Sequence, residues 1–447
     1  MKRLLTITLF VETIALAAST QEQSSIWTMD DCMRYALEHS TTVKKQKYTL
    51  STAEANLQTA TAAFLPTLSA TIDGQYNWGR SIDPETNTYN NVTTFNNSYG
   101  IYASIYLFDG GQTINQWKQA KVNRQMGMSD LQKAKDDKVI EVMQTYVDAV
   151  YCKGCLNYCS DKLQESQKTL YKTQRQEELG IKGKPDVAQI KAQVAQDNYN
   201  LTHQQNLYLA ALLKLKSSMN LPLTDSLSID TLLQNRTPES HFENAADIYA
   251  YASVYNPTAR SAALNVKNYQ LQYSISKGKL LPTLSLSAGV ATDYYRNLSS
   301  DTTPSFNSQF KNNRGEYVSA TLSIPLFDNL KRISDMRKAR NNMRSAIVEK
   351  EETMRKLHDD IEQAIMDRDG YAKEITQMAE KVDADTWAYH VTLRKFEEGM
   401  MNAIDLQTNA NTLLQSRVTL LQKRMLYVLK DRLVGYYKGN ALITDNK

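Results

Sequence analysis

The chain carries the same series of short sequences twice. Leu-Pro-Thr-Leu-Ser occurs at 65–69 and again at 281–285. Leu-Phe-Asp occurs at 107–109 and again at 326–328. The separation between first and second occurrence is nearly the same in both cases. One large unit has therefore been copied once, which excludes a solenoid of short repeats.

A glycine six positions ahead of an aspartate also occurs in each copy. Gly180 precedes Asp186 in the first copy, and Gly399 precedes Asp405 in the second, with the same separation as the two Leu-Phe-Asp sequences. A glycine followed by a carboxylate is typical of the place where one helix ends in left-handed geometry and another begins. This purely structural role accounts for both pairs, and a functional role is considered beside it below.

The first residues resemble a secretory signal. Lys2 and Arg3 precede an apolar run that ends in small residues, which predicts a signal peptide over residues 1–19. The predicted organisation of the rest is a first repeat over 20–239, a second repeat over 240–439 and a C-terminal tail over 440–447.

The net charge and the lengths of the apolar runs exclude some classes of function. The formal net charge is +4 over 447 residues, which is too balanced for the concentrated basic face that nucleic-acid binding needs. Beyond the N-terminal run, no apolar stretch approaches the length that a transmembrane helix requires. A membrane-spanning part would therefore consist of β-strands.

Four segments alternate apolar and polar residues and are predicted to be strands. Leu68, Ala70 and Ile72 share one face of the first, while Ser69 and Thr71 share the other. Strands of about ten residues with this alternation, and with Tyr or Trp near their ends, are typical of outer-membrane β-proteins. An ordinary half-buried antiparallel sheet has the same pattern. The predicted strands cover about 67–78, 98–108, 283–295 and 316–327, and the Asn-, Thr- and Ser-rich segments 79–97 and 296–315 are predicted to be loops.

Long helices fill most of the remaining sequence. Pro66 and Pro282 each end a helix and direct the chain into a strand. Beyond the returning strands, helical hairpins are predicted over about 111–219 and 329–437, with a first helix roughly 100 Å long. Helices of this length need other helices along their sides, so coiled-coil-like packing is expected.

Four strands are too few to close around a lumen. An unpaired strand edge in lipid leaves backbone groups without hydrogen bonds, which costs several kcal/mol for each group. Protomers are therefore expected to share one barrel. This argument predicts an oligomer and leaves the number of subunits open.

The duplicated passages resemble the TolC family of outer-membrane efflux proteins (outer membrane factors) over essentially the whole mature length. The resemblance rests on the order and double occurrence of Leu-Pro-Thr-Leu-Ser, Leu-Phe-Asp and the Gly-x5-Asp turns, together with Asn256-Pro257. In the first copy, Ser40-Thr41 stands where the second copy has Asn256-Pro257, and the first copy departs from the family there.

This resemblance implies an α+β membrane protein that is internally duplicated. It implies a homotrimer with twelve transmembrane strands in one outer-membrane β-barrel, surrounded by outer-membrane lipid and continued by a periplasmic α-helical barrel. It also implies two partners, a periplasmic adaptor (membrane fusion protein) and an inner-membrane pump. The chain would be a passive, gated conduit of a tripartite efflux or type I secretion system, carrying small molecules or proteins.

The resemblance also suggests roles at the turns between long helices. Asp405 matches an aspartate that rings the periplasmic aperture, and Asp186 and Phe396 match an acidic and an aromatic residue of the constriction. Thr408 stands where a second aspartate ring is expected and Met401 where an arginine is expected, so the gate is expected to depend more on packing than on ion pairs. The adaptor is expected to contact the tips, at Gly180, Ile181, Lys182, Gly399, Met400 and Met401.

Other chemistry-bearing residues have simpler interpretations. Cys152, Cys155 and Cys159 share one helical face, and a soft metal, a disulfide or ordinary packing remain open for them. His358 and Glu362 lie in a highly charged run that favours a solvated face. No metalloprotease, phosphate-binding or nucleophile motif is present, so we expect neither an enzyme nor a cofactor. The alternative to a channel is a periplasmic coiled-coil scaffold or adaptor with a soluble β-domain.

Overall fold

A computed structural model describes residues 26–82, 87–222, 224–232, 243–298 and 303–443. The predicted signal peptide, 1–19, lies outside the described residues. So do the predicted boundary between the repeats at 239 and 240 and the last four residues of the tail.

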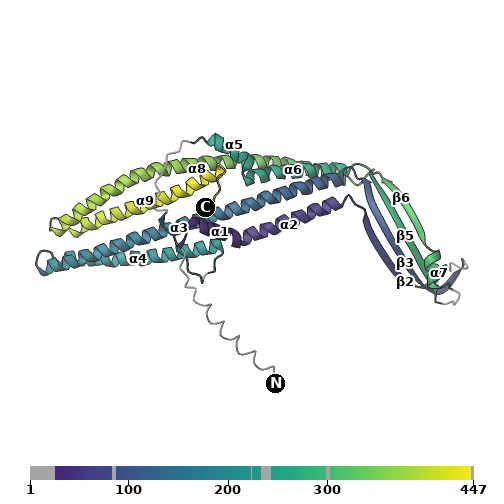
Figure 1. The fold of residues 1–447 in the computed structure, drawn as a ribbon, viewed down its shortest axis with the longest axis horizontal. Helices are drawn as coiled ribbons and strands as arrows, with labels where there is room; N and C mark the ends of the chain where they lie inside the picture. Colours follow the sequence, from purple (N-terminus) through teal and green to yellow (C-terminus); the bar gives the residue numbers. More distant parts are fainter. Residues whose placement is uncertain (1–25, 83–86, 223, 233–242, 299–302, 444–447) are drawn as a thin grey trace, which may run out of the picture. The chain divides into compact units, whose positions relative to one another are not determined.

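The two copies contain helices of nearly equal length in the same order (Figure 1). Helices α1 and α5 have 11 residues each, α2 and α6 have 22 each, and α3 and α8 have 67 each. Helices α4 and α9 have 36 and 35 residues. The bounds are α1 Met29–His39, α2 Thr41–Ala62, α3 Gln112–Glu178, α4 Lys184–Met219, α5 Ala245–Tyr255, α6 Pro257–Gly278, α8 Lys331–Glu397 and α9 Ala403–Tyr437.

The chain divides into two compact units, and each unit takes matching segments from both copies. The first contains the residues up to Lys45, Gln132–Asn256 and the residues from Lys356 onward. The second contains Gln46–Leu131 and Pro257–Arg355. The helical hairpin tips belong to the first unit and the larger sheet to the second.

The larger sheet is antiparallel with strand order β2-β3-β5-β6. Its register confirms the predicted alternation, because Leu68, Ala103, Ala288 and Val318 lie in one row across all four strands. The next row on the opposite face contains Ser69, Tyr102, Gly289 and Tyr317. One face of the sheet is thus apolar in all four strands.

Three of the four strands extend beyond their predicted ends. The observed strands are β2 Thr67–Ile82, β3 Tyr89–Phe108, β5 Thr283–Asn297 and β6 Gly315–Ser323. The predicted loop 79–97 is wrong, since Gly79–Ile82 pairs with Tyr89–Val92 in a continuous ladder. The low strand propensity of Asn and Ser is outweighed here by cross-strand pairing. The fourth strand is shorter than predicted because it ends at Ser323, opposite Thr283, where its partner β5 begins after Pro282.

The segment 296–315, predicted to be a loop, contains a short helix, α7 (Phe306–Asn312), which packs on β5. The side-chain amide of Gln309 donates to the carbonyl of Tyr295 at 2.8 Å, and its oxygen accepts the N–H of Tyr295 at 3.0 Å. Gln309 therefore provides hydrogen-bond partners for both the N–H and the C=O of Tyr295, which lies in the part of β5 that does not pair with β6.

The junction between the first two helices has a different structure in each copy. Asn256 ends α5, and Pro257 occupies the first position of α6. In the first copy Ser40 ends α1, and its hydroxyl accepts the N–H of Val43 at 3.3 Å in the first turn of α2. A hydroxyl cap thus replaces the proline of the second copy.

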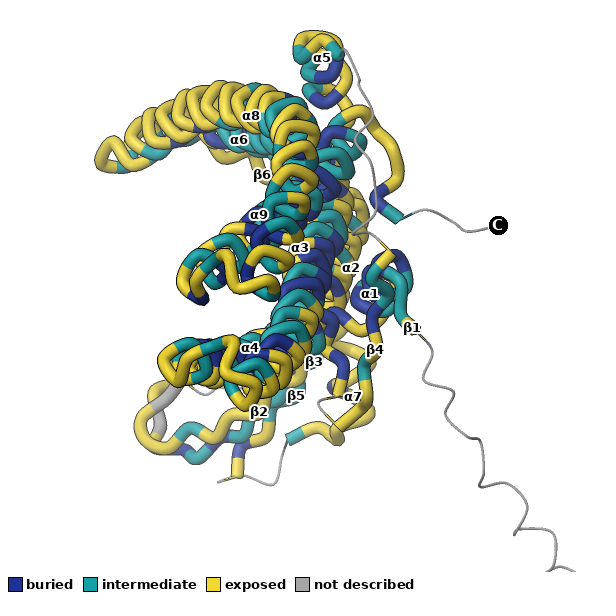
Figure 2. Tube along the Cα trace, turned by 90° about the vertical axis from the view of Figure 1, so that its left-hand side faces the viewer, coloured by how far each residue is buried: buried dark blue, intermediate teal, exposed yellow. Residues whose placement is uncertain are grey.

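Buried residues concentrate in the first unit, where side chains of α1, α3, α4 and α9 form one hydrophobic cluster (Figure 2). The core there includes Met33, Met143, Tyr146, Leu215 and Met219, none more than 1% exposed. Two short parallel strands, β1 (Ile26–Trp27) and β4 (Ser228–Ile229), close one side of it. No helix in the described part of the chain is both long and apolar enough to cross a membrane.

Candidate aperture at the hairpin tips

The two long helical hairpins turn at tips with the same backbone geometry. Tip 1 comprises residues 179–183 and tip 2 comprises residues 398–402, between the bounds of the flanking helices. Gly180 has φ 76° and Gly399 has φ 80°, which confirms the left-handed geometry predicted for both. In each tip the residue after the glycine donates its N–H to a carbonyl five residues back, from Ile181 to Gln176 and from Met400 to Lys395.

The two tip aspartates differ in what their carboxylates do. Asp186 and Asp405 both lie in the first turn of the returning helix, as predicted. The carboxylate of Asp186 accepts the N–H of Gly183 at 3.3 Å and so caps α4. At tip 2 the cap is the side chain of Asn402, which accepts the N–H of Asp405 at 2.9 Å. Among the described residues, the carboxylate of Asp405 has no hydrogen-bond or ion-pair partner.

Contacts from the first hairpin hold the end of α8. The ammonium of Lys182 lies 3.9 Å from the centroid of the Phe396 ring, and it donates to the carbonyl of Met401 at 3.5 Å. Lys172 forms an ion pair of 2.6 Å with Glu397, whose carbonyl accepts from the amide of Gln176 at 2.8 Å. Two cations and one amide of the first hairpin therefore bind the α8 end and tip 2.

Phe396 lies inside the protomer. Its side chain is 1% exposed and belongs to a cluster with Ile190 of α4 and with Tyr389, Ala403, Leu406 and Leu413 of the second hairpin. Met401 packs against the same cluster. By contrast, Ile181 is 60% exposed and Met400 is 65% exposed. The tips thus combine a buried aromatic anchor with apolar side chains that face solvent.

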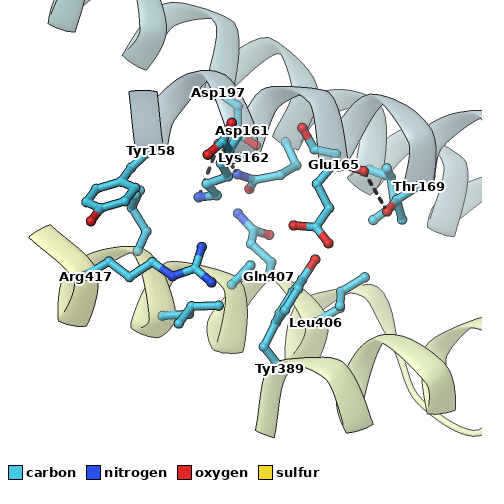
Figure 3. Close-up of a pocket in the computed structure, with 16 residues that line it drawn as sticks. Tyr158, Asp161, Lys162, Glu165, Thr169, Asp197, Tyr389, Leu406, Gln407 and Arg417 are labelled. Atoms are coloured by element: carbon cyan, nitrogen blue, oxygen red, sulfur yellow. Dashed lines mark hydrogen bonds and ion pairs between the residues drawn. The ribbon is translucent and has the colours of Figure 1, made fainter. Parts of the chain in front are cut away.

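A small cavity of about 70 Å³ lies between the two hairpins, further along α3 and α9 (Figure 3). Asp197 of α4 is 1% exposed and accepts from Lys162 at 3.2 Å and from the amide of Gln193 at 2.7 Å, all through Oδ1. Lys162 also donates to Asn411 of α9. The polar groups of the cavity therefore connect α3, α4 and α9.

On the other side of the cavity, Tyr389 of α8 points toward Glu165 of α3 (Figure 3). Burial raises the pKa of the Tyr389 hydroxyl, and the nearby Glu165 carboxylate raises it further through charge and a hydrogen bond. Tyr389 therefore stays protonated, with its hydroxyl facing the Glu165 carboxylate across the two hairpins (Figure 3).

The sequence interpretation named Lys182 but missed the other connecting residues. Lys162, Lys172, Asp197 and Glu397 are all charged residues on long, charge-rich helices, where periodicity does not single them out. One signal was present at Asp197: it follows Ile190 and Gln193 at helical spacing, which places a carboxylate on a buried stripe.

The cysteines of the described chain are free thiols. Cys32 is fully buried in the core, while Cys152 and Cys159 are partly exposed. No group of three or more His, Cys, Asp or Glu residues in the described part of the chain is arranged to hold a metal ion. His358 forms a long contact of 3.9 Å with Asp359 and is 40% exposed, as a solvated face would be.

The sequence matches the family of outer membrane efflux proteins over residues 33–221 and 249–429. The chain belongs to this family. Membership confirms the resemblance seen in the duplicated passages. The protein is therefore an outer-membrane efflux channel. It also decides against the periplasmic scaffold. No curated protein sequence matches the chain.

Solved structures show the same fold at low sequence identity. CmeC, an outer membrane channel of Campylobacter jejuni, is 15% identical with a TM-score of 0.81, covering 94% of this chain and 87% of its own. CusC, a protein that forms a transmembrane channel, is 15% identical with a TM-score of 0.79 and 92% coverage of both chains. VceC, an outer membrane protein of Vibrio cholerae, is 14% identical with a TM-score of 0.78, covering 93% of this chain and 96% of its own.

Proposed function

We propose that three copies of the chain form one outer-membrane conduit, gated at the hairpin tips, in a tripartite efflux or type I secretion system. An inner-membrane pump would supply the energy, and a periplasmic adaptor would connect the pump to the tips. The division into repeats at 20–239 and 240–439 forms part of the proposal and is supported by the matching helix lengths of the two copies.

The open sheet carries this proposal. Among the described strands, β2 and β6 pair on one side only, so both edges of the sheet present free backbone groups. Their apolar side chains face solvent in the single chain: Leu68 and Ile72 are 74% exposed and Val318 is 77% exposed. An apolar sheet in lipid needs both edges paired, and pairing β6 of one copy with β2 of the next achieves this in a closed ring. Three copies then give twelve strands.

The tips support an adaptor contact. Leu179, Ile181, Met400 and Ile404 are between 58% and 75% exposed, although they are apolar. An exposed apolar cluster of this kind is typical of a protein-binding surface. We therefore propose that the adaptor contacts the tips at Gly180, Ile181, Lys182, Gly399, Met400 and Met401 and at the apolar residues beside them.

Asp405 is the better candidate for an acidic ring at the aperture. Its carboxylate has no partner among the described residues, whereas the carboxylate of Asp186 is used to cap α4. Three copies of Asp405 around a threefold axis would attract cations. Phe396 would hold the tip closed from inside the protomer, through the cluster and through Lys182.

The test is single-channel conductance of the detergent-purified protein in a planar bilayer, with the subunit number determined by mass on the same sample. We expect a trimer with a stable, cation-selective conductance. Ala70→Pro, which removes an N–H group from the edge strand β2, is expected to abolish the trimer, whereas Ala62→Ser at the end of α2 is the control and is expected to leave it intact. A monomer or dimer without conductance would refute the proposal.

A further inference from the structure

The cavity between the hairpins contains two buried oxygens that nothing in the described protein satisfies. Asp197 is 1% exposed and its Oδ2 has no hydrogen-bond donor, and Gln193 is 8% exposed and its Oε1 has none either. Both residues line the cavity. Buried polar atoms without a partner are rare in native proteins and usually indicate a missing water, ion or ligand.

The chemistry of the occupant follows from these atoms. Both unsatisfied atoms are acceptors, so the occupant must donate hydrogen bonds. The charged residues of the lining are Asp161, Glu165 and Asp197 against Lys162 and Arg417, and Lys162 is already bound to Asp197 and Asn411. An anion would face unsatisfied oxygens with an excess of negative charge around it. A positively charged donor is favoured instead.

The size and lining of the cavity further limit which molecules could occupy it. About 70 Å³ is the space of roughly two water molecules, or of one small planar head group. Tyr158, Ile190, Tyr389 and Leu406 provide an apolar and aromatic lining for the rest of such a molecule. The described residues around it do not form a cluster of metal ligands.

We propose that this cavity is a binding site for a small organic cation with N–H donors, of the guanidinium or primary ammonium class. The cation donates to Oδ2 of Asp197 and Oε1 of Gln193 and is balanced by the excess acidic charge. Because the lining comes from α3, α4, α8 and α9, a bound cation holds the two hairpins together. The site does not include Asp405, but it shares Ile190, Tyr389 and Leu406 with the cluster around Phe396.

The test is isothermal titration of the purified full-length protein with methylguanidinium at millimolar concentration. Two matched ligands serve as controls. Methylurea has nearly the same shape but no charge, and a carbonyl oxygen that accepts replaces one of the amino groups; tetramethylammonium has the charge but no N–H donor. We expect saturable binding of methylguanidinium and at least tenfold weaker binding of the other two. Equal binding of methylurea, or no saturable binding because water alone fills the cavity, would overturn the proposal.

Two variants locate the site. Asp197→Asn keeps the shape but replaces the free acceptor, and it should weaken methylguanidinium binding about tenfold or more. Arg417→Gln removes a like charge from the lining and should strengthen binding about twofold or more. The second variant keeps the test decisive if the first folds poorly. Unchanged affinity in Arg417→Gln together with unchanged affinity in Asp197→Asn would place any observed binding elsewhere.

Discussion

The ammonium of Lys182 lies 3.9 Å from the ring centroid of Phe396, across the gap between the two hairpin tips. Lys182 belongs to the turn of the first hairpin and Phe396 to the last turn of α8, so this contact is one of several that join the two copies of the repeat near the tips. The cation sits over a ring that is 1% exposed. The contact therefore stabilises one arrangement of the tips, which in our proposal is the closed one.

Lys182→Met should shift the tips toward the open state. A cation–π contact contributes about 0.5–2 kcal/mol, which corresponds to an increase in the open-to-closed ratio by a factor of roughly 2 to 30. Single-channel recording measures this as open probability. Lys184→Gln is the control, because Lys184 is exposed at the start of α4 and its replacement removes the same charge. Equal effects of the two variants would show that charge, rather than contact with Phe396, is responsible.

Asp405→Ala should reduce the block of conductance by divalent cations, because it removes a carboxylate of the first turn of α9 that has no partner among the described residues. Thr408→Asp should increase the block by adding a second acidic residue one turn along α9. The measurement is the concentration of Mg²⁺ that halves the single-channel current. If Asp405→Ala leaves this concentration unchanged, Asp405 does not line the aperture.

Gly180→Ala should destabilise the protein by about 1 kcal/mol although the site has space. A Cβ atom at Gly180 would meet nothing within 4 Å, but the residue has φ 76°, which strains any L-side chain. Gly370→Ala is the matched control, since Gly370 lies inside α8 and also has open space around its Cβ position. There the same substitution should stabilise by about 0.5–1 kcal/mol. Thermal unfolding of both variants in detergent compares the two, and shifts of the same sign would contradict this account.

The pKa of Glu243 predicts a pH-dependent contribution to stability. Burial alone would raise this pKa, but hydrogen bonds from Lys438 and Arg368 and the charges of both outweigh burial and lower it below the usual 4.5. Arg368 is 2% exposed and pairs with Glu243 at 2.9 Å. The carboxylate therefore stabilises the fold above about pH 4.5, and this stabilisation is lost as the pH falls through the lowered pKa.

Glu243→Gln should accordingly cost roughly 3 kcal/mol at pH 7, because it leaves a buried guanidinium with less negative charge around it. The cost should shrink as the pH is lowered below about 4. Thermal unfolding at several pH values measures the difference. Glu374→Gln removes a carboxylate that is 46% exposed and paired with Lys423, so it should cost less than about 1 kcal/mol at any pH. A pH-independent cost for Glu243→Gln would show that its charge is not responsible.

The thiols should differ in their reactivity toward a maleimide at neutral pH. Burial raises the pKa of Cys155 to about 11 and that of Cys32 to about 12. Burial also raises the pKa of Cys152 and Cys159, but both of these residues are partly exposed. Mass spectrometry should therefore find Cys152 and Cys159 modified first and Cys32 last, with all four modified in denaturant. Early modification of Cys32 would indicate that the core opens.

The periodic features of this protein could be predicted from sequence because each depends on local spacing. Alternation at Leu68, Ala70 and Ile72 predicts the apolar face of the sheet, and the position of Gly180 and Gly399 predicts the helix ends. The duplication predicts that whatever one copy forms, the other forms too. Matching the sequence to its family then follows from the order of these features.

Strand pairing and cross-hairpin contacts were decided only in the tertiary structure. The residues at 79–97 have a loop-like composition, yet the two strands continue through most of them because each provides the other's hydrogen-bond partners. Likewise, nothing local distinguishes Lys162 and Lys172 from the many other lysines on these helices. Their roles depend on Asp197 and Glu397, which only the packing of helices brings near them. Local spacing determines which face of an element is apolar, whereas the choice of partner for a charge depends on the distances that folding creates.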